Sequence, residues 1–331
     1  MNILYTFNDK FVPQVGASIC SVCENNEKVD EIHFYLLTYQ LEEKNRQELT
    51  RLIDGYNRNV TFISLADLTS YFTFEFDTLG WNPVILARLL VGKLIPEIVE
   101  RILYLDGDTI VRHDLSELWE SDMNGCIIGA CVEPTVDKQR KNKLGLEHSP
   151  YFNSGVLLID LKRWRENKAG ERIIEFYREG QGKLFAPDQD AINGALKGEI
   201  YILSPKYNFS NTFIFYPYRT IKKLMEGNNF ISESAYKDSK KDPYIIHYLG
   251  EERPWRKGST HKYKNDYIHY LNKTPWKHTK LEDGWHLYFI CWRMFNFCMI
   301  PFPMIRYKLI NSLIPAFMRY RSNQLSKNNE K

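Results

Sequence analysis

The sequence lacks long apolar runs, because no segment has the roughly 18 uninterrupted apolar residues that a membrane-spanning helix requires. The N-terminus also lacks the basic flank and cleavage site of a signal peptide, since it runs directly into a predicted strand. Internal repeats and low-complexity stretches are absent as well. We therefore expect no spanning helix, and the 331 residues suffice for one large α/β domain with an appendix.

A strong excess of charge of one sign is also missing. The chain has 44 Lys and Arg residues against 41 Asp and Glu residues, a formal net charge of +3. This near balance argues against a strongly basic nucleic-acid binder, so we expect no nucleic-acid partner.

Cysteine is scarce, with six residues in the chain. These cysteines lie among apolar residues, which predicts buried free thiols and a reducing cytoplasmic location. The Cys20-Ser-Val-Cys23 spacing fits a redox motif, but the surrounding pattern of a thioredoxin-like unit is not there.

Short apolar runs alternate with helical patterns through the first two hundred residues. Such alternation predicts an α/β fold with a mostly parallel, Rossmann-like sheet and helices on both faces. The expected strands cover residues 3–7, 31–37, 60–65, 101–105, 126–133, 156–160 and 200–203, and the expected helices cover 12–24, 42–53 and 84–95. We expect two long loops, 135–149 and 209–241, which serve as lids and acceptor contacts or are irregular surface.

The strongest chemical signal is the segment Tyr104-Leu-Asp106-Gly-Asp108. It ends a predicted buried strand, where open α/β sheets place their ligands. Residues two apart in an extended chain point to the same side, so both carboxylates can reach one hard cation. Gly107 between them permits a ligand to approach the backbone closely. The pattern predicts a site for manganese or magnesium.

Three further segments follow the Asp-x-Asp pair in order. They are Tyr151-Phe-Asn153-Ser-Gly155 with the strand to Asp160, Asp188-Gln189-Asp190 with Asn193, and His247-Tyr-Leu-Gly250-Glu-Glu-Arg253-Pro-Trp255. Together the four motifs resemble glycosyltransferase family 8, and within it the bacterial lipooligosaccharide α-galactosyltransferases and α-glucosyltransferases. The resemblance runs from residue 2 to about residue 257.

The resemblance implies a GT-A type fold with a catalytic domain over residues 1–275. Its donor half covers about 1–110 and its acceptor half about 111–275. Asp106, Asp108 and His247 would hold the metal, best Mn²⁺ with Mg²⁺ also possible, since a neutral imidazole suits manganese better. Gly250 and Arg253 would contact the phosphates of the donor.

The resemblance also assigns residues to the nucleoside and the sugar of a UDP-sugar donor. The complete implied donor-binding set is Thr6, Asn8, Asp9, Phe11, Arg88, Asp106, Gly107, Asp108, Asn153, Ser154, Gly155, Asp188, Gln189, His247, Gly250 and Arg253. Asp188 and Gln189 are the implied catalytic residues. An amide is a poor nucleophile, so a front-face retaining mechanism fits Gln189 better than a covalent intermediate.

The sequence departs from the family pattern at four positions. Asn8 stands where relatives often have Asp, and Phe11 where they have Tyr. An amide oxygen still accepts a hydrogen bond from uracil and a phenyl ring still stacks. Arg253 replaces a lysine, and Glu133 replaces an Asp that lies on the sugar or acceptor side of the site. The last change leaves the identity of donor or acceptor open.

The C-terminal residues differ in character from the rest. Residues 285–321 contain no acidic residue and combine aromatics with three prolines. The cations of this stretch are Arg293, Arg306, Lys308, Arg319 and Arg321. Such a composition is typical of a chain in a lipid interface, so we predict that residues 276–331 are a helical extension that attaches the protein to anionic membrane. The alternative is a helical tail packed on the domain.

These observations favour a retaining hexosyltransferase that moves galactose or glucose from a UDP-sugar to a glycan. A lipid-linked oligosaccharide or cell-surface polysaccharide at the inner face of the bacterial membrane is the expected acceptor, and a glycosylated adhesin is the alternative. A nucleotidyltransferase is disfavoured because the first strand does not lead into a Gly-rich basic loop. A non-catalytic sugar-nucleotide binding module is disfavoured by the complete metal set.

Overall fold

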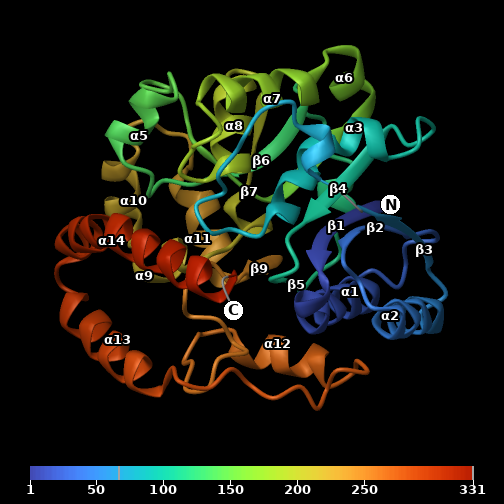
Figure 1. Ribbon diagram of the computed structural model, residues 1–331. Coiled ribbons are helices and arrows are strands. Elements are labelled where there is room, and N and C mark those ends of the chain that lie inside the picture. The colour runs from blue at the N-terminus through green and yellow to red at the C-terminus, as the bar shows by residue number, and fades with distance from the viewer. Residues whose placement is uncertain (66–67, 330–331) are drawn as a thin grey trace.

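A computed structural model describes residues 1–65 and 68–329, apart from the side chains of residue 69 and residues 317–329. A seven-stranded sheet forms its centre (Figure 1). In spatial order, the strands are β3 (Asn59–Ser64), β2 (His33–Tyr39), β1 (Asn2–Asn8), β4 (Arg101–Leu105), β7 (Phe152–Asp160), β6 (Ile128–Val132) and β8 (Ile200–Leu203). The β7 strand is antiparallel to β4 and β6, and the other pairs are parallel. The predicted mostly parallel sheet is confirmed.

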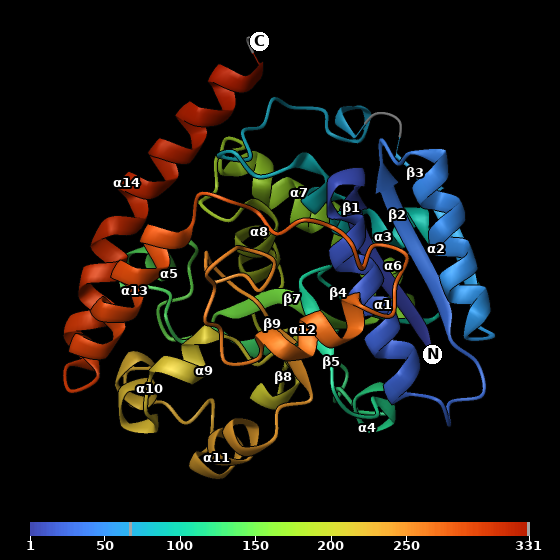
Figure 2. The same cartoon turned by 90° about the horizontal axis from the view of Figure 1, so that it is seen from below.

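Side chains of the strands alternate between two cores on opposite faces of the sheet. In β1, Ile3, Tyr5 and Phe7 pack into one core and Leu4 packs into the other. Helices α1 (Val12–Asn25) and α2 (Glu43–Gly55) contribute to the first core. The second core lies under the 3₁₀ helix η3 (Pro83–Leu90) and under α3 (Val91–Leu94), α6 (Leu161–Glu166), α7 (Ala169–Glu179) and α8 (Pro187–Ala195) (Figure 2). Burial on both faces explains why the strands are almost continuously apolar.

A second, two-stranded sheet was not predicted. It pairs β5 (Thr109–Val111) with β9 (Ile245–His247) in antiparallel register, and Thr109 lies opposite His247. Each strand has three residues, which is too short for an alternation pattern to be recognised. This pairing brings a distant segment of the chain beside the end of β4.

Several expected elements differ from the structure. The helix expected over 84–95 begins as a 3₁₀ helix, capped by Asn82, which accepts from the Val84 N–H, and continues as α3. The loop expected over 209–241 is wrong, because it contains α9 (Asn211–Phe215), α10 (Tyr218–Leu224) and α11 (Glu233–Lys241). The segment 135–149 contains α5 (Lys138–Lys143). The remaining short elements are α4 (Ser116–Trp119), α12 (Lys264–Leu271), η1 (Asp9–Phe11), η2 (Thr69–Tyr71) and η4 (Pro205–Tyr207).

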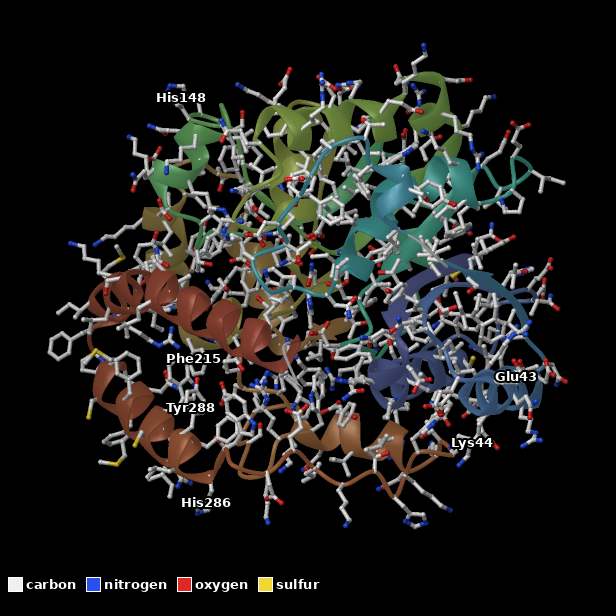
Figure 3. All side chains as sticks on the ribbon, viewed as in Figure 1. Glu43, Lys44, His148, Phe215, His286 and Tyr288 are labelled. Carbon is white, nitrogen blue, oxygen red and sulfur yellow. The ribbon has the colours of Figure 1, made fainter. Side chains whose placement is uncertain are left out.

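The C-terminal extension forms two helices side by side, α13 (His286–Met299) and α14 (Pro303–Asn329) (Figures 1 and 2). Arg306 of α14 is buried, and its guanidinium lies 4.2 Å from the ring centre of Phe215 and 5.5 Å from that of Trp292. Tyr288 stacks on Trp292, and Phe215 and Tyr288 mark this cluster in Figure 3. Within the described residues, no helix is both long and apolar enough to span a bilayer.

The expectation of buried thiols holds for part of the cysteines. Cys20, Cys23 and Cys131 are buried, whereas Cys126 is half-buried. For Cys291 and Cys298 the expectation is wrong, because both are exposed on α13. All six are free thiols.

Candidate active site

Asp106, Asp108 and His247 come together at the carboxyl end of β4. Asp106 follows the last residue of β4, Asp108 precedes β5, and His247 is the last residue of β9. The Nε2 atom of His247 lies 3.3 Å from Asp108 Oδ1 and 3.6 Å from Asp106 Oδ2. One ligand atom from each residue lies within 4.8 Å of the others. The predicted metal set is therefore assembled in one place.

The electrostatics of this group favour an ionised Asp108. Burial by itself raises the pKa of Asp108, but His247 and Arg253 together hold that pKa below its usual value. Burial also opposes a charge on His247, yet Asp108 and Asp106 raise its pKa above the usual value. The site therefore concentrates negative charge that attracts a cation.

Two glycines make room for these side chains. A Cβ atom at Gly155 would lie 2.1 Å from His247 Cε1 and 2.9 Å from Asp106 Oδ2. A Cβ atom at Gly107 would lie 2.6 Å from a methyl of Val15 and 2.9 Å from the ring of Phe11. Any side chain at Gly155 would therefore occupy the space between Asp106 and His247, and one at Gly107 would displace Phe11.

Arg88 connects the Asp-x-Asp pair to the Asp188-Gln189-Asp190 motif. Its guanidinium, 5% exposed, donates to Asp106 Oδ1 at 2.8 Å and lies 3.2 Å from Asp188 Oδ2. It also donates to the carbonyl of Ser154 at 2.9 Å, and its charge lies 4.3 Å from the ring centre of Tyr104. Burial raises the pKa of Asp188, and the cation of Arg88 counteracts that rise. Arg88 is therefore a buried positive centre, not a surface helix arginine.

The amide of Gln189 is held in one orientation. Its Oε1 accepts from the backbone N–H of Ser154 at 2.9 Å, and its Nε2 donates to the hydroxyl of Tyr151 at 3.1 Å. Since a backbone N–H only donates, this contact assigns the oxygen of the side chain. The hydroxyl of Ser154 donates to Asp188 at 3.0 Å. The two residues predicted to be catalytic are thus both tied to Ser154.

A buried ion pair between Arg140 and Asp190 holds the hydroxyl of Tyr151, to which Gln189 donates. Arg140 of α5 donates to Asp190 Oδ1 through Nη2 at 2.7 Å and through Nε at 2.9 Å. Tyr151 donates to the same carboxylate oxygen at 2.6 Å and accepts from Arg140 at 2.7 Å. The segment 135–149 is therefore not plain surface, because Arg140 reaches from it into the wall of the site.

The residues predicted to bind the nucleoside lie at the end of β1. Thr6 bonds to the hydroxyl of Tyr104 at 3.0 Å, and that hydroxyl donates to Asp106 at 2.5 Å. Phe11 packs edge-on to Trp255, with ring centres 5.8 Å apart. Asp9 points elsewhere, since its carboxylate accepts from the Glu42 N–H at 2.8 Å near the start of α2. Asn8 ends β1 beside them.

The loop after β9 carries the residues predicted to bind phosphate. Gly250 has φ +77, a conformation that favours glycine, and a Cβ atom there would meet open space. Arg253 donates to the carbonyl of Gly250 at 3.0 Å and lies over the ring of Trp255 at 5.5 Å. Besides His247, Arg253 also lowers the pKa of Asp108. Trp255 and Trp164 are buried.

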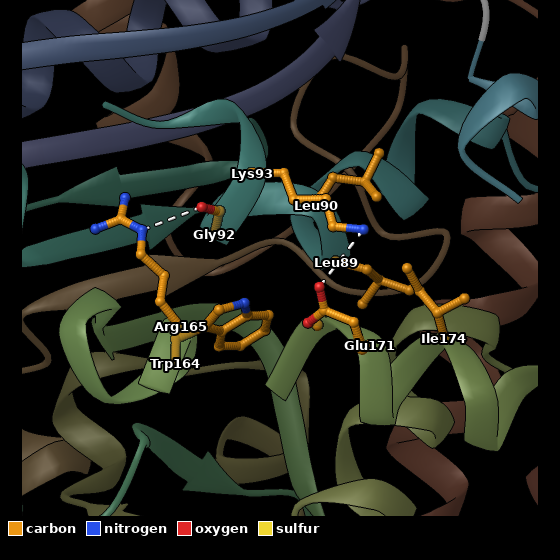
Figure 4. Close-up of a pocket in the computed structure, with 9 residues that line it drawn as sticks. Leu89, Leu90, Gly92, Lys93, Trp164, Arg165, Glu171 and Ile174 are labelled. Carbon is orange, nitrogen blue, oxygen red and sulfur yellow. Dashed lines mark hydrogen bonds and ion pairs between the residues drawn. The ribbon is translucent and has the colours of Figure 1, made fainter. Parts of the chain in front are cut away.

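A small cavity of about 110 Å³ lies away from these residues (Figure 4). It is bounded by η3 and α3 on one side and by α6 and α7 on the other, with Trp164, Arg165 and Glu171 in its wall. Arg165 donates to the carbonyl of Gly92 at 3.1 Å, and Lys93 pairs with Glu171 at 3.5 Å. The cavity holds none of the predicted site residues, and we assign it to helix packing.

Comparison with known proteins decides the family. The model of the family described as Glycosyl transferase family 8 matches residues 2–259. The chain belongs to glycosyltransferase family 8. This member is 26% identical to lipopolysaccharide 1,2-glucosyltransferase of Escherichia coli K12, over 86% of its own length and 81% of that protein. It is 25% identical to general stress protein A of Bacillus subtilis strain 168, over 83% of its length and 94% of the relative.

A solved structure gives the same result for the fold of this family 8 enzyme. Galactosyltransferase LgtC in complex with donor and acceptor sugar analogs superposes with a TM-score of 0.70 at 25% identity, covering 86% of this chain and 99% of that one. The GT-A fold is therefore confirmed. The protein is a glycosyltransferase, and its partners are a nucleotide-sugar donor and a glycan acceptor.

Sequence reasoning missed four side chains that shape the site. Tyr104 and Tyr151 stand inside the recognised motifs, and their hydroxyls reach Asp106 and Asp190. A tyrosine in a buried segment gives no sign of where its hydroxyl points. Arg140 lay in a segment expected to be loop. The fourth is Asn208, which bonds to His247 and had no distinguishing sequence context.

Proposed function

We propose that this enzyme transfers galactose or glucose from a UDP-sugar to a glycan acceptor, with retention at the anomeric carbon and with Mn²⁺ as cofactor. The observation that carries the proposal is the group of Asp106, Asp108 and His247 at the end of β4, joined to Asp188 by Arg88. Two carboxylates and one imidazole are a donor set that suits manganese, and magnesium is the weaker candidate.

The residues present fit such a cation. The gap above Gly155 leaves the ligand atoms of Asp106 and His247 facing each other without an intervening side chain. When bound, the cation would neutralise charge that develops on the diphosphate leaving group. Asp106, Asp108 and His247 would hold it, and Arg253 would bind phosphate oxygens beside it.

The other predicted residues would orient the donor sugar. Arg88 pairs with Asp188 and holds it close to Asp106, so that Asp188 can accept hydrogen bonds from sugar hydroxyls. The fixed amide of Gln189 is a weak nucleophile, which favours front-face transfer over a covalent intermediate. Thr6, Asn8 and Phe11 would contact the uracil, whereas the carboxylate of Asp9 is already engaged with α2.

We infer a catalytic domain over 1–275 and a membrane-attaching extension over 276–331. Both helices of the extension and the turn between them expose apolar side chains, namely Leu287, Met294, Phe297, Ile300, Phe302, Ile305, Leu309 and Leu313. Beside the turn between the helices, a groove of about 300 Å³ has Arg219 and Lys223 of α10 in its wall. Exposed apolar groups next to cations suit an anionic membrane surface.

The packing of the C-terminal helices changes which cations of the extension are available to lipid headgroups. Arg306 is buried against Phe215 and Trp292, so its charge does not reach lipid headgroups. The side chains of Arg319 and Arg321 lie outside the described residues. Exposed Arg293 and Lys308 remain available. The proposed location is the inner face of the bacterial cell membrane, where the acceptor would be a lipid-linked oligosaccharide or polysaccharide.

A donor screen tests the proposal without knowledge of the acceptor. The full-length protein is incubated with several UDP-sugars and Mn²⁺, and slow hydrolysis is measured as UDP release. We expect release from UDP-galactose or UDP-glucose, its loss in excess chelator, and its return with added Mn²⁺. Full activity in chelator would refute the metal assignment, and release from neither hexose donor would refute the donor assignment.

A further inference from the structure

Asn208 occupies a specific place behind the metal-binding histidine. It is 3% exposed and lies at the end of η4, just before Phe209, whose backbone pairs with β9. Its Oδ1 atom lies 2.8 Å from His247 Nδ1, and its Nδ2 donates to Asn153 Oδ1 at 2.8 Å. Asn208 thus connects Asn153, in the Tyr151–Gly155 motif (YFNSG), to His247, the first residue of the His247–Gly250 motif (HYLG).

The direction of this hydrogen-bond chain follows from its first member. The backbone N–H of Gly155 donates to Asn153 Oδ1 at 2.9 Å, and a backbone N–H cannot accept. The Asn153 atom is therefore the oxygen, and the Asn208 atom that bonds to it must be the NH₂ group. The remaining Asn208 atom is then the carbonyl oxygen, which accepts a hydrogen bond from His247 Nδ1.

This direction determines the tautomer of the neutral imidazole. With its hydrogen on Nδ1, His247 presents the lone pair of Nε2 to Asp106 and Asp108, at 3.6 and 3.3 Å. In the neutral ring this lone pair faces two carboxylates, an arrangement in which a metal cation can bind to all three groups in place of a proton. An acceptor that bonds to the other ring nitrogen of a ligand histidine orients the ring and makes the ligand nitrogen more basic.

We propose that Asn208 is a positioning residue for the cation site, fixing Nδ1 of His247 as the protonated nitrogen so that Nε2 binds the metal. The inference rests on the proposed metal assignment and adds a residue outside the predicted donor-binding set. It assigns Asn208 a role toward the cation and none toward the uracil or the sugar.

The test compares Mn²⁺ affinity with UDP affinity in the full-length protein. Mn²⁺ binding is followed by the loss of the free-ion electron paramagnetic resonance signal, and metal-free UDP binding is measured by calorimetry in chelator. For Asn208→Ala we expect Mn²⁺ to bind about 10- to 100-fold more weakly, with metal-free UDP affinity unchanged. Asn208→Asp, which keeps an acceptor toward Nδ1, should retain most of the Mn²⁺ affinity.

Asn26→Ala is the matched control for loss of a buried amide. Asn26 is 0% exposed, and its side chain bonds to backbone groups of Val22 and Leu115, away from the site. The Asn26→Ala substitution should lower the melting temperature without changing the affinity of the protein for Mn²⁺. If Asn208→Ala does not fold, Asn208→Ser replaces it, since its hydroxyl is too short to reach Nδ1.

Wild-type Mn²⁺ affinity in Asn208→Ala would overturn the inference and leave the proposed function intact. Equal losses in folded Asn208→Ala and Asn208→Asp would also overturn it, because the acceptor would then not matter. A wild-type protein that binds no Mn²⁺ in the presence of UDP would refute the metal assignment and this inference together.

Discussion

Gly155 and His247 are in such close contact that a single methyl group cannot fit between them. A Cβ atom at Gly155 would lie 2.1 Å from His247 Cε1, far inside the contact distance of two carbon atoms. The imidazole is 1% exposed, and its Nδ1 bonds to Asn208. The glycine of the YFNSG motif is thus required by the metal site and not by the backbone conformation of β7.

Gly155→Ala should therefore disable the enzyme more than it unfolds it. We expect UDP release from the sugar nucleotide to fall about 100-fold, the effect of displacing a reacting group by roughly 1 Å. The assay is donor hydrolysis at saturating Mn²⁺, with melting temperature measured in parallel. Gly55→Ala is the control, since a Cβ atom there meets nothing within 4 Å. Normal turnover in Gly155→Ala would show that His247 is not needed where the structure places it.

Asp188→Asn should separate sugar chemistry from nucleotide binding. The ion pair and the side-chain hydrogen bond of Asp188 involve Arg88 and Ser154, whereas the uracil would bind at the end of β1. We expect donor hydrolysis to fall about 100-fold while UDP affinity changes by less than about threefold. Kinetics of UDP release and calorimetry with UDP give the two quantities. Equal losses in both would place Asp188 outside the sugar site.

Polar substitutions on the outer face of α13 should weaken membrane attachment without touching catalysis. Leu287, Met294 and Phe297 are 72%, 63% and 74% exposed, so Leu287→Ser, Met294→Ser and Phe297→Ser together remove no core contact. We expect binding to vesicles of anionic phosphatidylglycerol to fall at least about tenfold, with donor hydrolysis retained.

Ile98→Ser is the control for those substitutions, because Ile98 is 89% exposed but belongs to the catalytic domain. Vesicle co-sedimentation measures the binding. Undiminished binding of the triple variant would move the membrane contact to another surface, with Arg219 and Lys223 the next residues to test. Removal of all residues after 280 is a poorer test than sequence alone suggests, since it would expose Phe215.

His261 should make the folded state sensitive to mild acid. Burial lowers the pKa of His261 from 6.5 to about 4, while its Nδ1 accepts from the Tyr263 N–H. Because the unfolded chain takes up the proton first, the stability due to neutral His261 is complete above pH 6.5 and is lost as the pH falls toward 4. The loss is on the order of 3 kcal/mol, at about 1.4 kcal/mol per pKa unit.

Urea unfolding of wild type and His261→Gln at several pH values between 7 and 4 measures this effect. The variant should be less stable at pH 7 and should lose less stability on acidification. Subtracting the free energy of unfolding of the variant from that of wild type at each pH removes the contribution of the carboxylates, which both proteins share. Parallel pH profiles would mean that His261 titrates normally in the folded state.

Local sequence patterns predicted the part of the site that is formed by residues adjacent in sequence. Asp106, Gly107 and Asp108 follow an apolar strand, and that context was enough to predict a candidate metal site at the end of β4, where the structure brings His247 beside the two carboxylates. Arg306 shows the limit of such reasoning. A cation among aromatics suggests a lipid interface, but the rings that surround Arg306 include Phe215, which is remote in sequence.

Short elements escaped prediction for a related reason. The three residues of β9 form a strand only because β5 pairs with them, and no periodicity within three residues can reveal a partner. The same holds for α9, α10 and α11, whose aromatic residues pack into the core against distant segments. Asn208 could not be recognised at all, because its role depends on the direction of hydrogen bonds that only the assembled fold defines.

The pairing of β5 with β9 has a consequence for the synthesis of the protein on the ribosome. All four strands from β1 to β4 are translated long before His247, so a nascent chain can build one half of the sheet while its cation pocket still has only two carboxylates. The pocket is completed when the segment carrying β9 leaves the exit tunnel and closes over Asp106 and Asp108. If the proposed manganese binds there, its tight capture would mark the end of folding, and unfinished chains would compete poorly for the metal.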